Sequence, residues 1–163
     1  GILAALAAPS FGAAIDRWRV RQAISDLEAT LYFARSEAIK RGGNVSIQKT
    51  ANIPGGCQNA GTTQEWGCGW IIFSDLNNNG TRQAAEPILR EIAMTGNVNV
   101  MRYPSGNSLK FDRYGMTNGS NTLRYVVLPA STGVSSDNTY TLCIAAGGRI
   151  RSLAGEIDCK SKP

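Results

Sequence analysis

The strongest constraint on the fold of this chain is a helical pattern that covers residues 1–41 without a break. Apolar side chains recur there every three or four positions and would form one face of a helix: Val20, Ile24, Leu27, Leu31, Ala34 and Ala38. The opposite face carries charge: Arg17, Arg19, Asp26, Glu28, Arg35 and Glu37. Pro9 lacks a backbone donor and is expected to kink or loosen the first turns. The run KRGG at 40–43 places cations and then glycine where the helix should end.

A helix of this length does not fit inside one domain. Residues 1–41 would extend about 60 Å, whereas a compact domain of 163 residues is about 30–35 Å across. We therefore expect residues 20–41 to pack on the rest of the chain and residues 1–19 to protrude. The opening run GILAALAAPSF is almost wholly apolar but too short to span a bilayer. A protruding apolar helix needs lipid or other helices around it.

From residue 42 onward the hydrophobic pattern changes to the alternation that is typical of β-strands. Clusters of Gly, Asn, Ser and Pro separate eight predicted strands: NVSIQK, CGWIIFSD, PILREIAM, NVNVMRY, SLKFDRYG, TLRYVVLPA, TYTLCIAA and GRIRSL. The predicted fold class is therefore α+β. A long N-terminal helix (residues 1–41) would pack on an antiparallel β-sheet head (residues 42–163).

The four cysteines are widely spaced and do not form the close pairs of a zinc site. An even number at such spacings is typical of two disulfides in an oxidising compartment. Four cysteines allow three pairings, and some could instead be free buried thiols. We prefer Cys57–Cys68 and Cys143–Cys159, because each pair closes a short local loop. In the chain-entropy account each such bond stabilises the fold by about 3 kcal/mol.

The composition lacks the residue type that enzymes use most often as a general base. The sequence has no His, which is the usual general base and the commonest metal ligand in proteins. It has no phosphate-binding glycine motif either. We predict that the protein is not an enzyme and needs no cofactor. The formal net charge of +5 permits contact with nucleic acid or with an anionic surface, but it proves neither.

The segment DLNNNGTRQAAE (75–86) matches the spacing of a calcium-binding loop of the EF-hand type. The candidate ligands are Asp75, Asn77, Asn79 and Glu86. A strand precedes the segment where an EF-hand has a helix, and Arg82 stands where that loop usually has an apolar residue. Only two carboxylates are available, so any calcium site here would be weak. The alternative is a polar turn in which Asn and Gly adopt left-handed backbone.

The run GGRIRSLAG (147–155) could present two cations together. On a strand, Arg149 and Arg151 would share one face about 6.6 Å apart, and Ile150 would face the core. Guanidinium groups bind phosphate oxygens in a bidentate manner and stay charged. Gly147 and Gly148 would let the backbone turn and let a phosphate approach closely. The plain alternative is a hairpin with two solvated arginines.

Several stretches resemble the GspH/FimT/FimU group of minor type IV pilins and pseudopilins. The opening GILAALAAP resembles the N-terminal helix of type IV pilins, and three later stretches resemble this group: AISDLEATLYFARSEAIKRGGNVSI, WGCGWIIFSDLNNNGTRQAAEPILR and GRIR. The resemblance implies a type IV pilin-like fold and contact with other pilins through the N-terminal helix. It also implies a single pass of the inner membrane with a periplasmic head, and later a place in the pilus at the cell surface. Gly1 would correspond to a point inside the apolar segment of the family.

FimT members of this group carry a Gly-Arg-x-Arg pattern that is implicated in binding DNA during natural transformation. The residues that the resemblance assigns to DNA are Gly148, Arg149 and Arg151, and Lys160 and Lys162 would add charge. Glu156 and Asp158 lie nearby and would oppose binding. The predicted ligand is double-stranded DNA, bound through its phosphates without sequence preference. The alternative is a minor pilin or type II secretion pseudopilin that acts only in initiation and assembly of the filament.

Overall fold

A computed structural model describes residues 2–117, 122–131, 137–145 and 147–159, with side chains from residue 12 onward. Its elements are α1 (Ile2–Arg41), β1 (Val45–Lys49), β2 (Gly69–Ser74), β3 (Ile88–Ala93), β4 (Val98–Tyr103), β5 (Ser108–Phe111), β6 (Leu123–Pro129), β7 (Tyr140–Ile144) and β8 (Ile150–Ala154). Each of the strands lies within, or for β8 overlaps, a segment that the alternation predicted. The α+β class predicted from the sequence is therefore confirmed.

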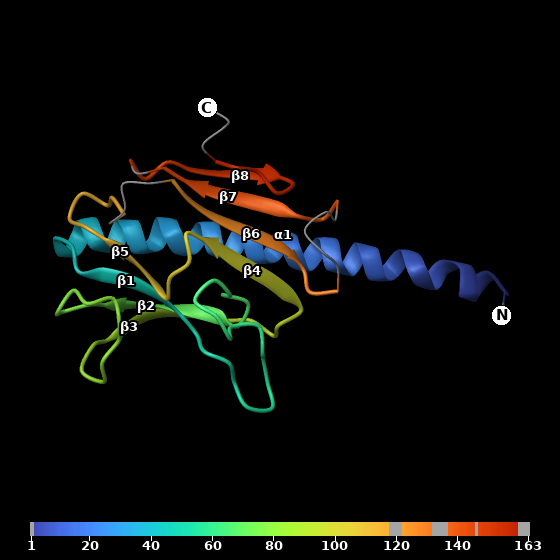
Figure 1. The fold of residues 1–163 in the computed structure, drawn as a ribbon, viewed down its shortest axis with the longest axis horizontal. Coiled ribbons are helices and arrows are strands. Elements are labelled where there is room, and N and C mark those ends of the chain that lie inside the picture. The colour runs from blue at the N-terminus through green and yellow to red at the C-terminus, as the bar shows by residue number, and fades with distance from the viewer. Residues whose placement is uncertain (1, 118–121, 132–136, 146, 160–163) are drawn as a thin grey trace.

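Helix α1 continues through Pro9 and ends at Arg41, where the predicted glycines follow. The amide of Gly43 donates to the carbonyl of Ala38 at 2.7 Å, which closes the last turn. Among the residues whose side chains are described, the buried face of α1 begins at Val20. Figure 1 shows the first part of the helix extending beyond the sheets. No helix within the described residues has the length and apolarity that crossing a membrane requires.

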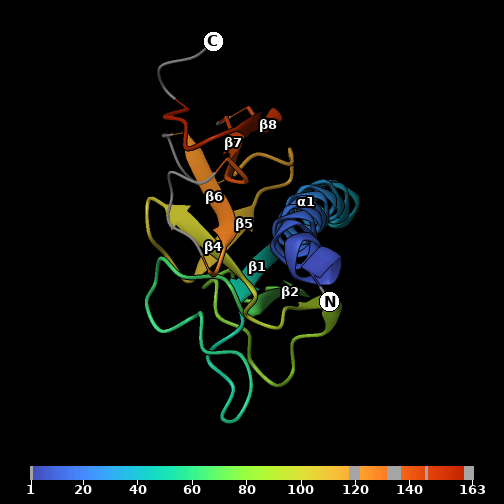
Figure 2. The ribbon, with the colours of Figure 1, turned by 90° about the vertical axis from the view of Figure 1, so that its right-hand side faces the viewer.

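The eight strands form two antiparallel sheets rather than the one sheet expected from the pattern. Their orders are β3-β2-β1-β5 and β4-β6-β7-β8. Strand β4 pairs with β6, and the loop before β2 covers its other edge: the Trp66 amide donates to the Val100 carbonyl, and the Arg102 amide donates to the Gln64 carbonyl, both at 2.8 Å. Both sheets lie against the same side of α1 (Figure 2). Local alternation predicts strands but not the partner of each strand.

One core joins the helix to both sheets. The buried stripe of α1 packs with Trp66, Trp70 and Tyr125, and the rings of Trp66 and Tyr125 meet edge to face at 5.4 Å. The buried hydroxyl of Thr30 on α1 accepts a hydrogen bond from Trp70 Nε1 at 2.9 Å. This bond satisfies the one polar atom that Trp70 brings into the core. The α1 stripe predicted from the sequence is thus the helix face that holds the head.

Both disulfides preferred from the sequence are present, and no cysteine is free. Cys57–Cys68 lies in the loop between β1 and β2. Hydrogen bonds from Lys49, the last residue of β1, hold the same loop. The Lys49 ammonium donates to three carbonyls of this loop, those of Ala60, Thr62 and Glu65. Burial lowers the pKa of Lys49. Cys143–Cys159 ties the end of the described chain to β7.

Candidate nucleic-acid interface

The two predicted DNA-binding arginines lie at and just after the turn that joins β7 to β8. The Ala145 amide donates to the Arg149 carbonyl at 2.9 Å, and the Gly148 amide donates to the Ala145 carbonyl at 2.8 Å. Gly148 has a φ of +77°, a backbone conformation that favours glycine. The Arg149 side chain is exposed. The turn lies towards the C-terminal end of α1 and away from the N-terminus (Figure 1).

The two glycines of the turn have different surroundings. At Gly147 nothing lies within 4 Å of the place where a Cβ would stand, so this backbone is open to a close approach. At Gly148 that place lies 2.8 Å from Nη1 of Arg35, which also donates to the Gly148 carbonyl at 2.9 Å. The expectation of a phosphate close to Gly148 therefore differs from the structure, in which Arg35 fills the space. Arg35 is half-buried here and is not a solvated residue of the charged helix face.

Strand β8 separates its side chains as the alternation predicted. Ile150 packs against the core and lies opposite Ile144 of β7. Arg151 lies opposite Cys143, on the face of the sheet away from α1, and is half-buried. Arg149 precedes the strand and pairs with Ala145 through its backbone. The turn and the start of β8 thus place an exposed arginine, Arg149, two residues before a half-buried one, Arg151.

A further arginine lies on this outer face, and the sequence analysis did not single it out. The strand registers place Arg124 of β6 between Tyr103 of β4 and Cys143 of β7, and Cys143 is opposite Arg151. The Arg124 guanidinium lies 4.6 Å from the centre of the Tyr103 ring and donates to the Ile157 carbonyl at 3.0 Å. Its position follows from pairing between distant strands, so no local motif could have indicated it.

The segment after β8 folds back over the same outer face. The Thr141 hydroxyl donates to the Gly155 carbonyl at 2.7 Å and accepts from the Ile157 amide at 3.0 Å. Glu156 comes within 4.0 Å of Arg124, so at least one of the carboxylates expected to oppose binding does lie on this face. Cys143–Cys159 fixes the end of the segment. Lys160 and Lys162, which were predicted to add charge, lie outside the described residues.

In the candidate calcium loop, the carboxylate of Asp75 already accepts several hydrogen bonds. Its donors are the hydroxyl of Ser46 at 2.6 Å, the amide of Asn79 at 3.0 Å and the amide of Gly80 at 2.8 Å. The amide oxygen of Asn77 accepts from the Asn79 amide, and that of Asn79 accepts from the Thr81 amide. Glu86 is buried, and its Oε2 accepts from the Gln83 amide at 2.8 Å. These bonds are those of a polar turn, whereas the other carboxylate oxygen of Glu86, Oε1, is buried without a hydrogen-bond partner.

We expect the melting temperature of the protein to be the same in calcium as in a chelator. Apart from Glu86 Oε1, which is buried without a hydrogen-bond partner, the side-chain oxygens of Asp75, Asn77, Asn79 and Glu86 each have a donor within the loop, so a cation would have to displace or share these bonds. Differential scanning fluorimetry over a calcium titration measures the effect. An upward shift that Asp75→Asn removes would instead establish the loop as a calcium site.

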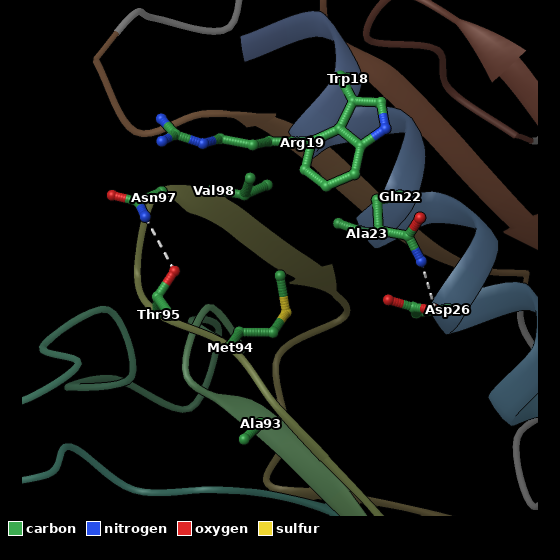
Figure 3. A pocket seen from close by; sticks show the side chains of 10 residues that line it. All are labelled: Trp18, Arg19, Gln22, Ala23, Asp26, Ala93, Met94, Thr95, Asn97 and Val98. Carbon is green, nitrogen blue, oxygen red and sulfur yellow. Dashed lines mark hydrogen bonds between the residues drawn. The ribbon is translucent and has the colours of Figure 1, made fainter. Parts of the chain in front are cut away.

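A groove of about 220 Å³ lies where α1 leaves the head (Figure 3). The helix contributes Trp18, Arg19, Gln22, Ala23 and Asp26, and the segment from the end of β3 to the start of β4 forms the other wall. Trp18 is 66% exposed, which is unusual for so large an apolar side chain. Met94 and Val98 provide apolar surface opposite the helix. The groove therefore offers an apolar site with a polar rim, next to the part of α1 that extends beyond the head.

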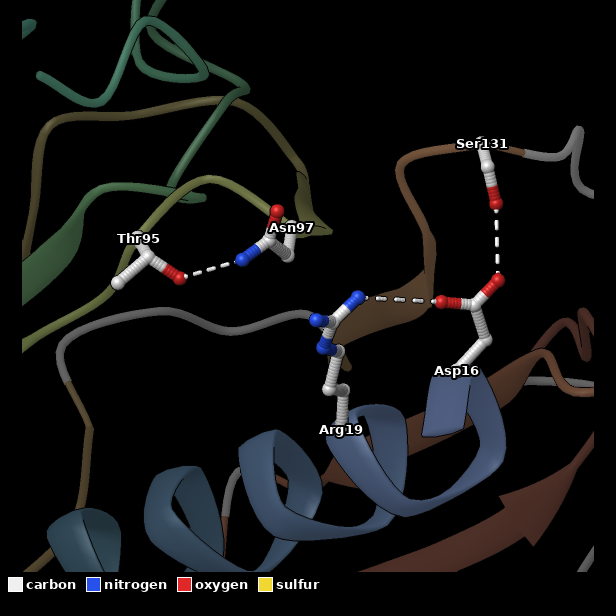
Figure 4. Close-up of polar contacts among 5 residues, drawn as sticks. All are labelled: Asp16, Arg19, Thr95, Asn97 and Ser131. Carbon is white, nitrogen blue, oxygen red and sulfur yellow. Dashed lines mark hydrogen bonds and ion pairs between the residues drawn. The ribbon is translucent and has the colours of Figure 1, made fainter. Parts of the chain in front are cut away.

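Polar contacts tie α1 to the head near the same place (Figure 4). The carboxylate of Asp16 accepts from the hydroxyl of Ser131 at 3.0 Å and lies 3.5 Å from Nη1 of Arg19. Ser131 follows β6, so this contact joins the helix to the second sheet. Across the groove, the side chain of Asn97 donates to the Thr95 hydroxyl at 2.8 Å. Of these contacts, the exposed hydrogen bond between Ser131 and Asp16 joins the helix to the head and adds to the packing there.

Solved structures with a similar fold include two crystal forms of the type IV minor pilin FimU of Pseudomonas aeruginosa. The first has a TM-score of 0.62 at 22% identity, covering 82% of this chain and 91% of FimU. The second has a TM-score of 0.64 at 22% identity, with coverages of 83% and 89%. The similarity at this identity is one of fold, and it confirms the pilin-like architecture. No curated protein sequence matches the chain.

The family model described as type II transport protein GspH matches residues 23–149. The match begins in the half of α1 that packs on the head and ends at Arg149 in the turn before β8. It therefore spans the shared core and seven of the strands, β1 to β7. The helix packed on antiparallel sheets and this match agree, and the chain belongs to the GspH family of minor type IV pilins and pseudopilins.

Proposed function

We propose that this minor pilin binds double-stranded DNA without sequence preference, through Arg149 and Arg151, and captures it for uptake in natural transformation. The observation that carries the proposal is the exposed Arg149 on a turn that the helix holds at a defined place. Arg151 follows it on the outer face of the sheet. A guanidinium binds phosphate oxygens with two parallel hydrogen bonds and stays charged at every physiological pH.

The place of the turn suits a filament component. In a pilus built on N-terminal helices, the first part of α1 would be buried among the helices of its neighbours. The β7–β8 turn lies towards the other end of the head, so it would stay accessible after assembly (Figure 1). Before assembly, we propose that the same helix anchors the protein in the inner membrane with the head in the periplasm. The two disulfides agree with that oxidising compartment.

Binding through phosphates accounts for the absence of a base-reading element from the described residues. Within them α1 is the only helix, and its apolar face is buried in the core. Recognition helices read bases by entering the major groove with a free face. Affinity for DNA should then be weak for one subunit and should fall steeply as salt rises.

The test is a fluorescence anisotropy titration of a labelled random duplex, from about 50 to about 200 mM salt. Arg149→Ala combined with Arg151→Ala should lower the affinity at least tenfold. The slope of log K against log salt should shrink by about 1.8, since each lost phosphate contact removes about 0.9. The free energy of unfolding should stay within about 1 kcal/mol of the wild type, because both side chains are at least partly exposed.

A matched control removes two positive charges from the other end of the molecule. Arg17 and Arg21 are exposed on α1, so Arg17→Ala combined with Arg21→Ala makes the same change in net charge. This control should keep most of the affinity and of the salt slope. Equal losses for the two double variants would mean that net charge, and not the turn, drives binding. Unchanged binding by the Arg149 and Arg151 variant would end the proposal.

The second candidate function is assembly of a pilus or secretion pseudopilus without a role in DNA binding. The groove beside the exposed Trp18 favours it, because it lies next to the part of α1 that would enter a filament. Wild-type protein that does not bind the duplex at low salt would leave assembly as the function. The two candidates are compatible, since the groove and the turn lie towards opposite ends of the head.

A further inference from the structure

We propose that Arg35 is the positioning residue of the DNA-binding turn and that its contact from α1 keeps the turn in one conformation. This inference rests on the proposed function of Arg149 and Arg151. Arg35 lies on α1, 113 residues before Gly148, and the pattern of the helix placed it on the solvated face. Its Nη1 donates to the Gly148 carbonyl at 2.9 Å. The turn is therefore bonded directly to the helix.

A side chain at position 148 would meet the guanidinium of Arg35, which would have to move aside. A Cβ at this position would lie 2.8 Å from Nη1 and 2.9 Å from the central carbon of the guanidinium of Arg35. Gly148 also has a positive φ, a backbone conformation that favours glycine whether or not Arg35 moves. The glycine of the Gly-Arg-x-Arg pattern therefore leaves space for the guanidinium of Arg35, and Arg149 is the residue that follows this glycine. The position of Arg149 follows from this contact.

A second glycine turn lies against the stem of the same side chain. A Cβ at Gly115, where φ is +70°, would lie 2.6 Å from Cγ and 3.0 Å from Nε of Arg35. Gly115 belongs to the turn after β5, which Asp112 closes by accepting from the amides of Tyr114 and Met116 at 2.9 Å. Strand β5 belongs to the first sheet and β8 to the second. Arg35 therefore packs against one turn from each sheet and is hydrogen-bonded to the turn before β8.

The charge of Arg35 has no acidic partner among the described residues. The ion pairs found in that part of the chain join Arg19 to Asp16, Lys40 and Arg41 to Glu37, and Arg124 to Glu156. An arginine whose task was only to hold the head together would gain from a carboxylate. A carbonyl acceptor instead fixes the turn and leaves the site positive. Ordering the turn before DNA arrives lowers the entropic cost of binding.

The test compares Arg35→Met with Arg35→Lys in the anisotropy titration used for the arginine pair. Arg35→Met removes the bond to Gly148 and should weaken DNA binding about tenfold, while the salt slope stays within about 0.3 of the wild type, because positioning removes no phosphate contact. Arg35→Lys keeps one donor for the Gly148 carbonyl and should recover part of the affinity. Gly148→Ala also strains a backbone with positive φ and should weaken binding at least as much, and its effect should be smaller when it is added to Arg35→Met, because both changes break the same contact.

Arg41→Met is the matched control, since it removes one charge from the same end of the helix without touching the turn. Arg41 is hydrogen-bonded to Glu37 at 2.7 Å, and this bond lowers the pKa of Glu37. The control should keep nearly full affinity.

Wild-type affinity for Arg35→Met, alongside a loss for the Arg149 and Arg151 variant, would overturn the positioning role and leave the proposed function intact. A salt slope for Arg35→Met that is smaller by about 0.9 would also overturn it, because Arg35 would then be a phosphate ligand itself. Melting curves confirm that each variant is folded.

Discussion

Replacing Gly69 by alanine is expected to remove at least about 4 kcal/mol of folding free energy and to leave much of the protein unfolded. Gly69 begins β2 with a φ of +98°, and a Cβ there would lie 2.1 Å from the carbonyl oxygen of Ile92 in β3. No side-chain movement relieves a clash with backbone, so β3 would have to leave β2. Urea denaturation followed by tryptophan fluorescence measures the loss, since Trp70 is the next residue and is fully buried.

Gly147→Ala is the matched control for this substitution. No atom lies within 4 Å of the added methyl group at that position, so its unfolding free energy should stay within about 0.5 kcal/mol of the wild type. The same chemical change is thus expected to have opposite consequences at two glycines. Wild-type stability for Gly69→Ala would contradict the close approach of β2 and β3.

Removing the bond between Cys143 and Cys159 is expected to cost about 3 kcal/mol, because it closes a loop with a sequence separation of 16. The double variant Cys143→Ser, Cys159→Ser should therefore melt well below the wild type. Its C-terminal segment should also become sensitive to protease, since non-covalent contacts, among them the hydrogen bonds to Thr139, Thr141 and Arg124, would then hold residues 155–157 on the sheet without a covalent link. Thermal melts and mass spectrometry of the cleavage products measure both effects.

The second disulfide provides the comparison. Cys57→Ser with Cys68→Ser opens a loop with a separation of 11 and should cost a similar free energy of about 3 kcal/mol. Cleavage should then move to the segment between β1 and β2 and spare the C-terminal end. Identical melting of wild-type protein with and without a reductant would mean that neither bond contributes to stability.

Local patterns in the sequence predicted much of this fold. The apolar stripe from Val20 to Ala38 predicted the packing face of α1, and strand-like segments separated by Gly, Asn, Ser and Pro predicted each of the strands. Short loop length predicted both disulfides. These features depend on neighbours a few residues apart, so a local pattern contains them. The division into two sheets depends on which strands pair: β4 pairs with β6, and the segment around Trp66 covers its other edge.

For the candidate interface too, local patterns in the sequence predicted nearby residues but not contacts between distant parts of the chain. The motif at 148–151 indicated Arg149 and Arg151, and Ile150 packs against the core as its spacing predicted. Arg35 and Arg124 were not indicated, since they reach this region only through contacts with residues far away in the chain. A glycine next to an arginine is too common to predict a long-range contact. The surroundings of Gly148 had to be known before its role could be distinguished from that of Gly147.

The covalent bond between Cys143 and Cys159 has a mechanical consequence for any molecule pulled at the β7–β8 turn. Strand β8 lies at the edge of its sheet, where a pulling force could peel it away one hydrogen bond at a time. The bond encloses the turn and the whole of β8 within a covalent ring. A load on Arg149 would pass along the chain into β7 and, through the bond to Arg35, into the helix, and the disulfide would limit how far β8 could be drawn out.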